Sequence, residues 1–257
     1  MKHLKFAAAL LCATVMAPTA SFASDISVST GVDYVSEYVF RGLAFGGASV
    51  QPYAEASIGD FTVGGWFSTQ IGEESALASD EFDLYVGYSV PLDSSISLDL
   101  GATYYHFPQG GSFFSTDGGN TGSYEVSASV GLGEVPLAPA VTAYYDFTFE
   151  SFTLEGNVGH SFAIGESQSF DLGLTAGLVD VSGGSYEWAT ASASVSHSFT
   201  DDVSAYIGGN FSVNTTDDTL DFEEIFTVDA DGVVTDISGG GTSDSKLWFG
   251  VGVAAGF

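Results

Sequence analysis

The chain has 257 residues, of which 45% are hydrophobic and 14% aromatic, and its 33 acidic residues face only four lysines and arginines, for a formal net charge of −29. This charge excludes nucleic acid as a partner, because too few cations are present to neutralise phosphates. It also argues against docking on anionic lipid through a basic patch. The hydrophobic and aromatic content is too high for an intrinsically disordered chain.

The N-terminus has the features of a secretory signal peptide. A short basic segment and an apolar run up to about residue 17 precede small residues at the −3 and −1 positions, Ser21 and Ala23. We therefore assign residues 1–23 to a signal peptide cleaved after Ala23 and residues 24–257 to one folded domain. The alternative is a transmembrane anchor, but the run is shorter than the roughly 20 residues that span a bilayer.

Cleavage changes the chemistry of the mature chain. It removes Cys12, the only cysteine, so no internal disulfide forms, and it leaves Arg41 and Lys246 as the only cations against 33 acids. An exported chain of this size without disulfides needs a large core or closed backbone hydrogen bonding.

Alternation of apolar with small or polar residues marks most of the mature chain. Residues 82–90 read FDLYVGYSV and residues 247–257 read LWFGVGVAAGF, a period of two that predicts strands of about ten residues. No apolar run in this part approaches the length of a membrane helix. We count twelve such segments, at about 26–40, 48–58, 61–71, 81–90, 96–106, 123–132, 140–149, 152–164, 169–179, 186–199, 203–214 and 245–257.

The predicted connections alternate in length. Those near 41–47, 72–80, 107–122, 180–185 and 215–244 are longer than the ones between them, with the join near residue 150 as the exception. Short turns on one side, longer loops on the other and an even strand number are typical of outer-membrane barrels. We predict an all-β, transmembrane, antiparallel up-and-down barrel of about twelve strands with both termini periplasmic. A secreted β-sandwich is the alternative, although its strands are usually shorter.

The apolar residues at alternate positions of these strands would face lipid, so the residues between them would line a lumen. Two cations cannot neutralise the acids on that side, and surplus negative charge concentrates cations and repels anions. The plainer interpretation is that these charges only keep the interior wet. The pore-lining candidates are Arg41, Lys246, Asp33, Glu37, Glu55, Asp83, Asp99, Glu125, Asp146, Glu155 and Asp171.

Aromatic residues cluster near the predicted strand ends, as in the interfacial girdles of outer-membrane barrels. Twelve strands give a backbone radius of roughly 12 Å, which inward aromatics would narrow to the size of small solutes. The girdle candidates are Trp66, Phe67, Tyr104, Tyr105, Phe107, Tyr144, Tyr145, Phe147, Phe149, Tyr186 and Trp188, and the inward candidates are Tyr53, Trp66, Tyr85, Tyr105 and Tyr144.

Two predicted loops bear on the pore. Loop 107–122, which reads FPQGGSFFSTDGGNTG, either folds inward and narrows the lumen or folds outward. Loop 215–244 holds nine acids, and DADG at 229–232 resembles half of a calcium loop, but it lacks the terminal bidentate glutamate. We expect a solvated acidic loop or diffuse binding of divalent cations near lipopolysaccharide.

Several segments resemble a known family. Residues 38–42 read YVFRG, Gln51-Pro52 follows about ten residues later, and Gly65-Trp66 comes next. This part of the chain resembles the TorF-family porins, also called the Gcw_chp family of proteobacterial proteins. The resemblance covers most of the mature chain, is strongest over 30–110, and implies an outer-membrane channel. The C-terminal segment ending in Phe257 resembles the signal by which outer-membrane barrels engage their assembly machinery.

An enzyme is the less favoured class. Outer-membrane phospholipases place serine and histidine on the lipid face, but no serine lies two residues from His106, His160 or His197, so no pair exists within a strand. The chain contains no HExxH, GxSxG or phosphate-loop motif, and we expect no cofactor. A structural or adhesive barrel with a plugged lumen is the other alternative to a porin-like channel for small polar or cationic solutes.

The two mature cations are predicted to meet. With the lumen-facing positions assigned above, Arg41 lies near the extracellular end of the first strand and Lys246 begins the last strand at the same end. A closed barrel makes these strands neighbours, so we expect both cations at the seam near the pore mouth. There they either steady the seam through ion pairs or form a cationic spot that orients dipolar solutes. The candidate partners are Glu37, Glu55 and Asp244.

Overall fold

The structure is a computed structural model that describes residues 26–71, 80–92, 95–116, 121–181, 184–216, 226–228, 234–237 and 245–257. The assigned signal peptide lies outside these residues, as does loop 217–244 apart from two short strands, and so does the DADG segment. None of the helices described is long and apolar enough to cross a membrane.

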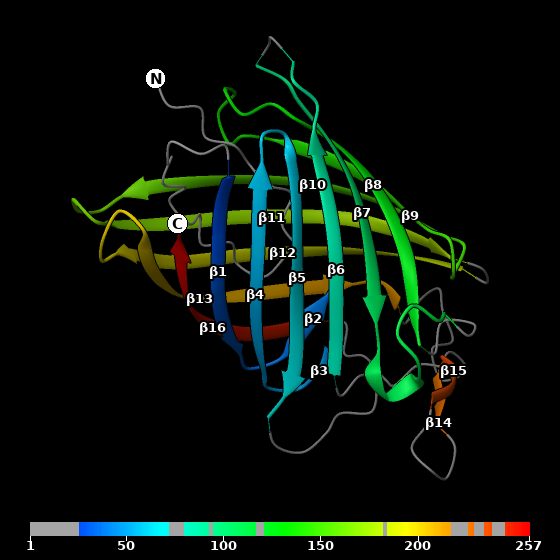
Figure 1. The fold of residues 1–257 in the computed structure, drawn as a ribbon. Coiled ribbons are helices and arrows are strands. Elements are labelled where there is room, and N and C mark those ends of the chain that lie inside the picture. The colour runs from blue at the N-terminus through cyan, green and yellow to red at the C-terminus, as the bar shows by residue number, and fades with distance from the viewer. Residues whose placement is uncertain are drawn as a thin grey trace.

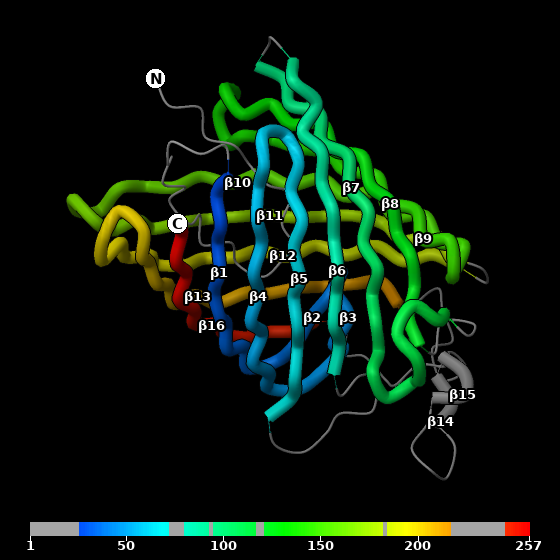
Figure 2. Tube along the Cα trace, in the orientation of Figure 1, coloured from blue at the N-terminus to red at the C-terminus, as the bar shows by residue number. Residues whose placement is uncertain are grey.

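Twelve antiparallel strands form a closed barrel, in which β1 pairs with β4 on one side and with the last strand, β16, on the other. Figures 1 and 2 show β16 beside β1, where the ring closes. The barrel strands are β1 (Ile26–Val35), β4 (Ser49–Ile58), β5 (Phe61–Gln70), β6 (Asp80–Ser89), β7 (Ser97–His106), β8 (Gly122–Gly131), β9 (Ala140–Asp146), β10 (Ser151–Ala163), β11 (Gln168–Val181), β12 (Gly184–Ser198), β13 (Val203–Asn214) and β16 (Ser245–Gly256). The predicted strand number and class are confirmed.

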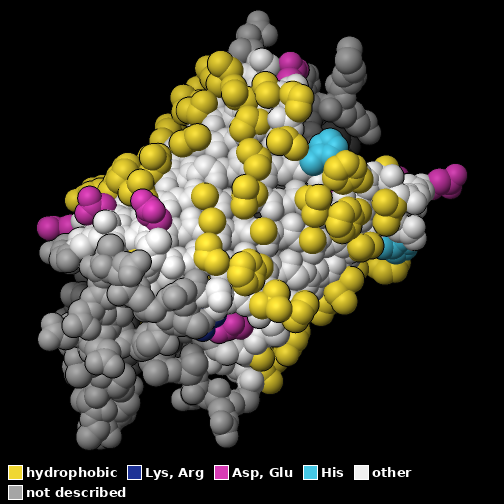
Figure 3. All heavy atoms as spheres, turned by 180° about the vertical axis from the view of Figure 1, so that it is seen from behind, with side chains coloured by type: hydrophobic (Ala, Val, Ile, Leu, Met, Phe, Trp, Pro, Cys, Tyr) yellow, Lys and Arg dark blue, Asp and Glu magenta, His cyan; other side chains and the backbone are white. Residues whose placement is uncertain are grey.

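The alternating sequence explains the two faces of the wall. In β16, Leu247, Phe249 and Val251 are exposed, whereas Trp248 and Gly250 between them are buried. Figure 3 shows hydrophobic side chains spread over the outer face and acidic ones toward its margins. Because the ladder is closed, backbone groups of the wall pair within it and leave no strand edge.

The two ends of the barrel differ in their connections. At the end where β1 begins and β16 stops, which we call the terminal end, the chain turns between β4 and β5 within two residues. The opposite end, which we call the loop end, carries the longer connections between β1 and β4 and between β13 and β16. The predicted longer loop at 180–185 is wrong, because β11 and β12 continue until only two residues separate them.

The first connection at the loop end is a small hairpin inside the barrel. Its strands are β2 (Tyr38–Phe40) and β3 (Leu43–Gly46), which pair with each other and with no barrel strand. The predicted strand at 26–40 therefore ends early, at Val35. Alternation continues through Tyr38 and Phe40, but these rings pack against the lumen wall instead of facing lipid. We call residues 36–48 the lumen hairpin.

Loop 107–122 takes the outward of its two predicted courses in the part that is described. A short 3₁₀ turn, η1 (Pro108–Gly110), opens it. The centre of the Phe113 ring then lies 5.8 Å from that of the Phe82 ring and 4.6 Å from that of the His106 ring. Phe82 and His106 both occupy outward-facing positions of their strands. The segment thus covers the outside of the rim, and the lumen hairpin is the element that enters the pore.

Two further short strands, β14 (Phe226–Val228) and β15 (Val234–Ile237), pair with each other within the connection between β13 and β16.

Candidate functional site: the barrel lumen

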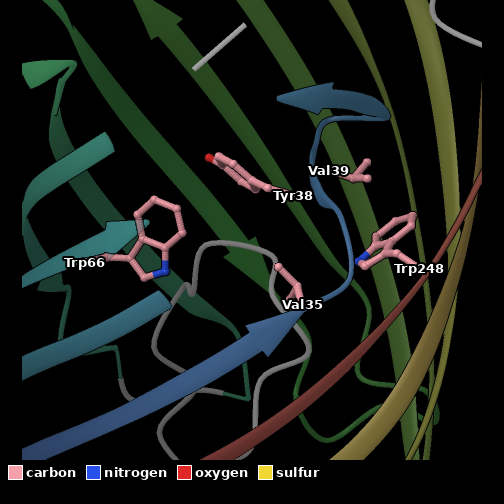
Figure 4. Packing of buried hydrophobic residues seen from close by; sticks show 5 residues of the cluster. All are labelled: Val35, Tyr38, Val39, Trp66 and Trp248. Carbon is pink, nitrogen blue, oxygen red and sulfur yellow. The ribbon is translucent and has the colours of Figure 1, made fainter. Parts of the chain in front are cut away.

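The lumen hairpin crosses the barrel. It leaves the wall after β1 and reaches Glu125 on β8, which is five strands away from β1 around the ring through β4. On the way its residues contact inward side chains of β5 and β16, including Trp66 and Trp248. Figure 4 shows Tyr38 and Val39 between these two tryptophans, with Val35 at the end of β1.

The tip of the hairpin is a tight two-residue turn. Arg41 and Gly42 have φ angles of 47° and 81°, and two successive positive values define the turn type that best fits a two-residue hairpin. Gly42 has a second constraint, because a Cβ there would lie 2.6 Å from the Trp188 Cβ on β12. Asn214 on β13 donates a hydrogen bond from Nδ2 to the Gly42 carbonyl at 2.9 Å, so the tip is docked on the wall.

Arg41 is held by a bidentate ion pair. Its two terminal nitrogens donate to the Glu125 carboxylate at 2.8 and 2.9 Å, and only 12% and 5% of the two side chains are exposed. Tyr105 on β7 donates its hydroxyl to the same carboxylate at 2.9 Å. The guanidinium carbon lies 4.5 Å from the centre of the Tyr144 ring on β9 and 4.7 Å from that of Phe40.

This setting keeps Arg41 charged. Burial alone would lower the pKa of the guanidinium, but the Glu125 carboxylate more than offsets this and raises the pKa of Arg41 above its ordinary value. A positive charge is therefore fixed inside a wall lined by acids.

A second contact ties the hairpin to β6. Tyr38 donates its hydroxyl to Glu81 Oε2 at 3.0 Å, and both side chains are buried. Asp83, two residues along on the same face, is fully buried, and neither of its oxygens accepts a hydrogen bond from a described residue. Two adjacent buried carboxylates repel each other when both are ionised.

The predicted meeting of the two cations is wrong. Lys246 pairs with Glu37 at 3.3 Å across the seam, and Glu37 was one of its three candidate partners. Arg41 is not on the first strand, because the chain turns into the lumen after Val35, and it bonds to Glu125 on the opposite wall. The alternation of inward and outward positions in the sequence does not indicate that the chain leaves the wall after Val35.

The remaining candidate acids fall into four settings. Asp33 and Glu155 are buried in the wall, and Glu55 accepts hydroxyl hydrogen bonds from Ser29 and Tyr85 at 3.2 and 3.1 Å. Asp146 caps the turn after β9, because its Oδ1 accepts the backbone N–H groups of Thr148 and Phe149 at 2.8 and 2.9 Å. Near the terminal end, serine hydroxyls donate to Asp99 and Asp171 at 2.7 to 3.0 Å.

Glu81 was not among the predicted pore-lining residues. It lies two positions from Asp83, on the same face of the strand, so the alternation could have identified it as pore-lining. Several predicted girdle residues also face inward. Trp66, Tyr186 and Trp188 are buried in two clusters that also include residues of the lumen hairpin, and Tyr105 is buried with its ring 6.3 Å from that of Phe40. Large rings at strand ends serve either face, so the pattern alone cannot assign them.

A family model described as "Bacterial protein of unknown function (Gcw_chp)" matches residues 19–222, most of the chain. The chain belongs to the Gcw_chp family. The matched region of this Gcw_chp protein includes the lumen hairpin and Glu125. The family description states no activity, so the TorF porin name stays a prediction. No curated relative matches the sequence.

Two solved porins share the fold of this Gcw_chp protein. The KdgM porin, also solved in complex with disordered oligogalacturonate, is 10% identical over 90% of this chain and 99% of its own, with a TM-score of 0.53. The NanC porin is 13% identical over 89% of this chain and 98% of its own, with a TM-score of 0.51. At such identities the similarity extends to the fold alone.

Proposed function

We propose that this protein is an outer-membrane channel through which small neutral or cationic solutes diffuse passively, and that the lumen hairpin forms its constriction. The observation that carries the proposal is the distribution of polarity. The wall is apolar outside, and its interior is lined by carboxylates and hydroxyls. A lumen with surplus negative charge concentrates cations and repels anions.

We expect solutes that differ in charge from the molecule found in complex with the KdgM porin. The molecule in complex with that porin is an oligogalacturonate, a chain of sugar acids. Here both cations of the described residues, Arg41 and Lys246, are already paired with carboxylates. A polyanion would therefore meet acids without a matching free cation, so we assign small solutes without net negative charge.

The orientation and the partners belong to the same proposal. Residues 1–23 direct export, the terminal end with its short turns faces the periplasm, and the loop end faces lipopolysaccharide. The apolar outer face contacts membrane lipid, and the segment ending in Phe257 engages the barrel assembly machinery. Protease protection of tags placed at either end in intact cells tests the orientation.

A plugged barrel with a structural role is the second candidate, because the lumen hairpin lies across the interior and is packed there. An enzyme receives less support. The residues paired directly with the three histidines in adjacent barrel strands are Phe82, Gly122, Leu172, Gln168 and Ala205, none of which is a serine.

Recording from the purified protein in planar bilayers separates these functions. In a potassium chloride gradient we expect discrete channels whose reversal potential shows a preference for cations. A preference for chloride contradicts the selectivity, whereas the absence of any conductance favours the plugged barrel.

A further inference from the structure

The wall around Arg41 is a complete receptor for a guanidinium group. Glu125 supplies two carboxylate oxygens at 2.8 and 2.9 Å, and Tyr105 fixes that carboxylate with a hydroxyl hydrogen bond of 2.9 Å. Tyr144 offers the face of its ring 4.5 Å from the guanidinium carbon. These three residues, which we call the guanidinium pocket, stand on the adjacent strands β7, β8 and β9.

The pocket and its present occupant differ in how firmly they are built. The pocket belongs to the closed ladder, in which β8 is paired along its whole length with β7 and from Glu125 to Gly131 with β9. Arg41 belongs to a hairpin whose strands of three and four residues share three pairs, interrupted by a register shift. Isolated two-stranded hairpins are marginal in water, so the hairpin keeps its docked position only through its contacts with the wall, whereas the pocket is held by the barrel ladder.

An empty pocket would demand a replacement cation. With the hairpin docked only 4% of Glu125 is exposed, and undocking would take away the cation that its carboxylate is paired with. The geometry also selects the replacement. A guanidinium group is planar, so it can donate two parallel hydrogen bonds to one carboxylate and stack on an aromatic ring. An ammonium group is a compact point charge that does neither.

We propose that the guanidinium pocket binds small solutes that carry a guanidinium group, and that Arg41 occupies it as a built-in surrogate until such a solute displaces it. Displacement would detach the tip of the lumen hairpin from β8. The role of this exchange in passage rests on the proposed channel function, whereas binding itself does not require it. The Arg41 side chain competes with the solute for the pocket at an effective concentration on the order of millimolar, as for other short tethers. In the unmodified protein, therefore, only a concentrated solute displaces it.

Chemical rescue tests the binding. The thermal midpoint of the purified protein in detergent is followed by tryptophan fluorescence for Arg41→Ala, which empties the pocket, and for Arg41→Ala/Glu125→Gln, which also removes its carboxylate. Each is titrated with methylguanidinium chloride, with methylammonium chloride and with sodium chloride at equal ionic strength. We expect methylguanidinium to raise the midpoint of the single variant with at least about tenfold higher apparent affinity than methylammonium, and to leave the double variant unchanged.

Equal responses to all three salts, or a response that persists in the double variant, overturn the proposal. If Arg41→Ala does not assemble, Arg41→Lys retains a cation without the fork, and the same selective rise is expected at higher concentrations. Its absence there also overturns the proposal. Channel recordings test the proposed function separately. Selective binding of methylguanidinium without any conductance would contradict only the channel function, and conductance without selective binding would contradict only the guanidinium pocket.

Discussion

At the scale of single residues, the central feature is one arginine in an unusual backbone conformation. Arg41 has a φ of 47°, a region that costs a side-chain-bearing residue roughly 1–2 kcal/mol. The bidentate pair with Glu125 and the flanking rings offset that cost. This explains why a chain with only four lysines and arginines places one of them directly before Gly42, at the tip of a turn.

We expect Arg41→Ala to reduce the free energy of unfolding by about 3–5 kcal/mol, because it leaves Glu125 buried without its partner. Glu125→Gln should cost a similar amount, and the double variant less than the sum of the two. Urea unfolding in detergent, followed by tryptophan fluorescence, provides the three values. Strict additivity would show that the two side chains are not energetically coupled.

Gly42 offers a test of the docked tip, with Gly59 as its matched control. Both have positive φ angles, 81° and 60°, but a Cβ at Gly59 meets nothing within 4 Å, whereas one at Gly42 meets Trp188. Gly59→Ala should cost only the backbone strain of about 1–2 kcal/mol. Gly42→Ala should cost more, because the tip must also move away from β12. Equal losses in urea unfolding would mean that the tip does not rest on Trp188.

At the scale of elements, the barrel strands were predictable and the lumen hairpin was not. Period-two alternation with small inward residues specifies a wall strand, as β16 illustrates. Tyr38 and Phe40 continue the same alternation, yet they pack on rings inside the lumen. The Arg-Gly turn was the available signal for a reversal of the chain. Glu125 was assigned inward by parity, but its pairing with Arg41 depends on a crossing of the lumen that no local pattern encodes.

The hairpin's contact with β6 should influence how long the pore stays closed. Tyr38→Phe removes the hydroxyl that donates to Glu81 at 3.0 Å, and a typical hydrogen bond contributes about 1 kcal/mol. We expect more frequent or longer open states in single-channel records. Tyr124→Phe is the control, because its hydroxyl donates to the Phe114 carbonyl on the exposed outer rim. Identical open times in both variants would separate Tyr38 from gating.

At the scale of the whole molecule, charge is distributed by depth. Acids near the terminal end accept hydrogen bonds from serine hydroxyls, whereas those at the level of the lumen hairpin face Arg41 or lie buried beside one another. The hairpin therefore places the one buried cation of the described residues within the lumen. Cation preference should fall as ionic strength rises, because salt screens the carboxylates over shorter distances.

The proposed channel function depends most directly on whether the lumen hairpin is the constriction of a cation-preferring pore. Its decisive measurement is single-channel conductance and reversal potential in a potassium chloride gradient, for the unmodified protein and for a variant in which residues 37–47 are replaced by a short glycine-serine linker. We predict a several-fold higher conductance in the variant, with the cation preference kept because the wall acids remain. Unchanged conductance, or a preference for chloride in either protein, would contradict the account.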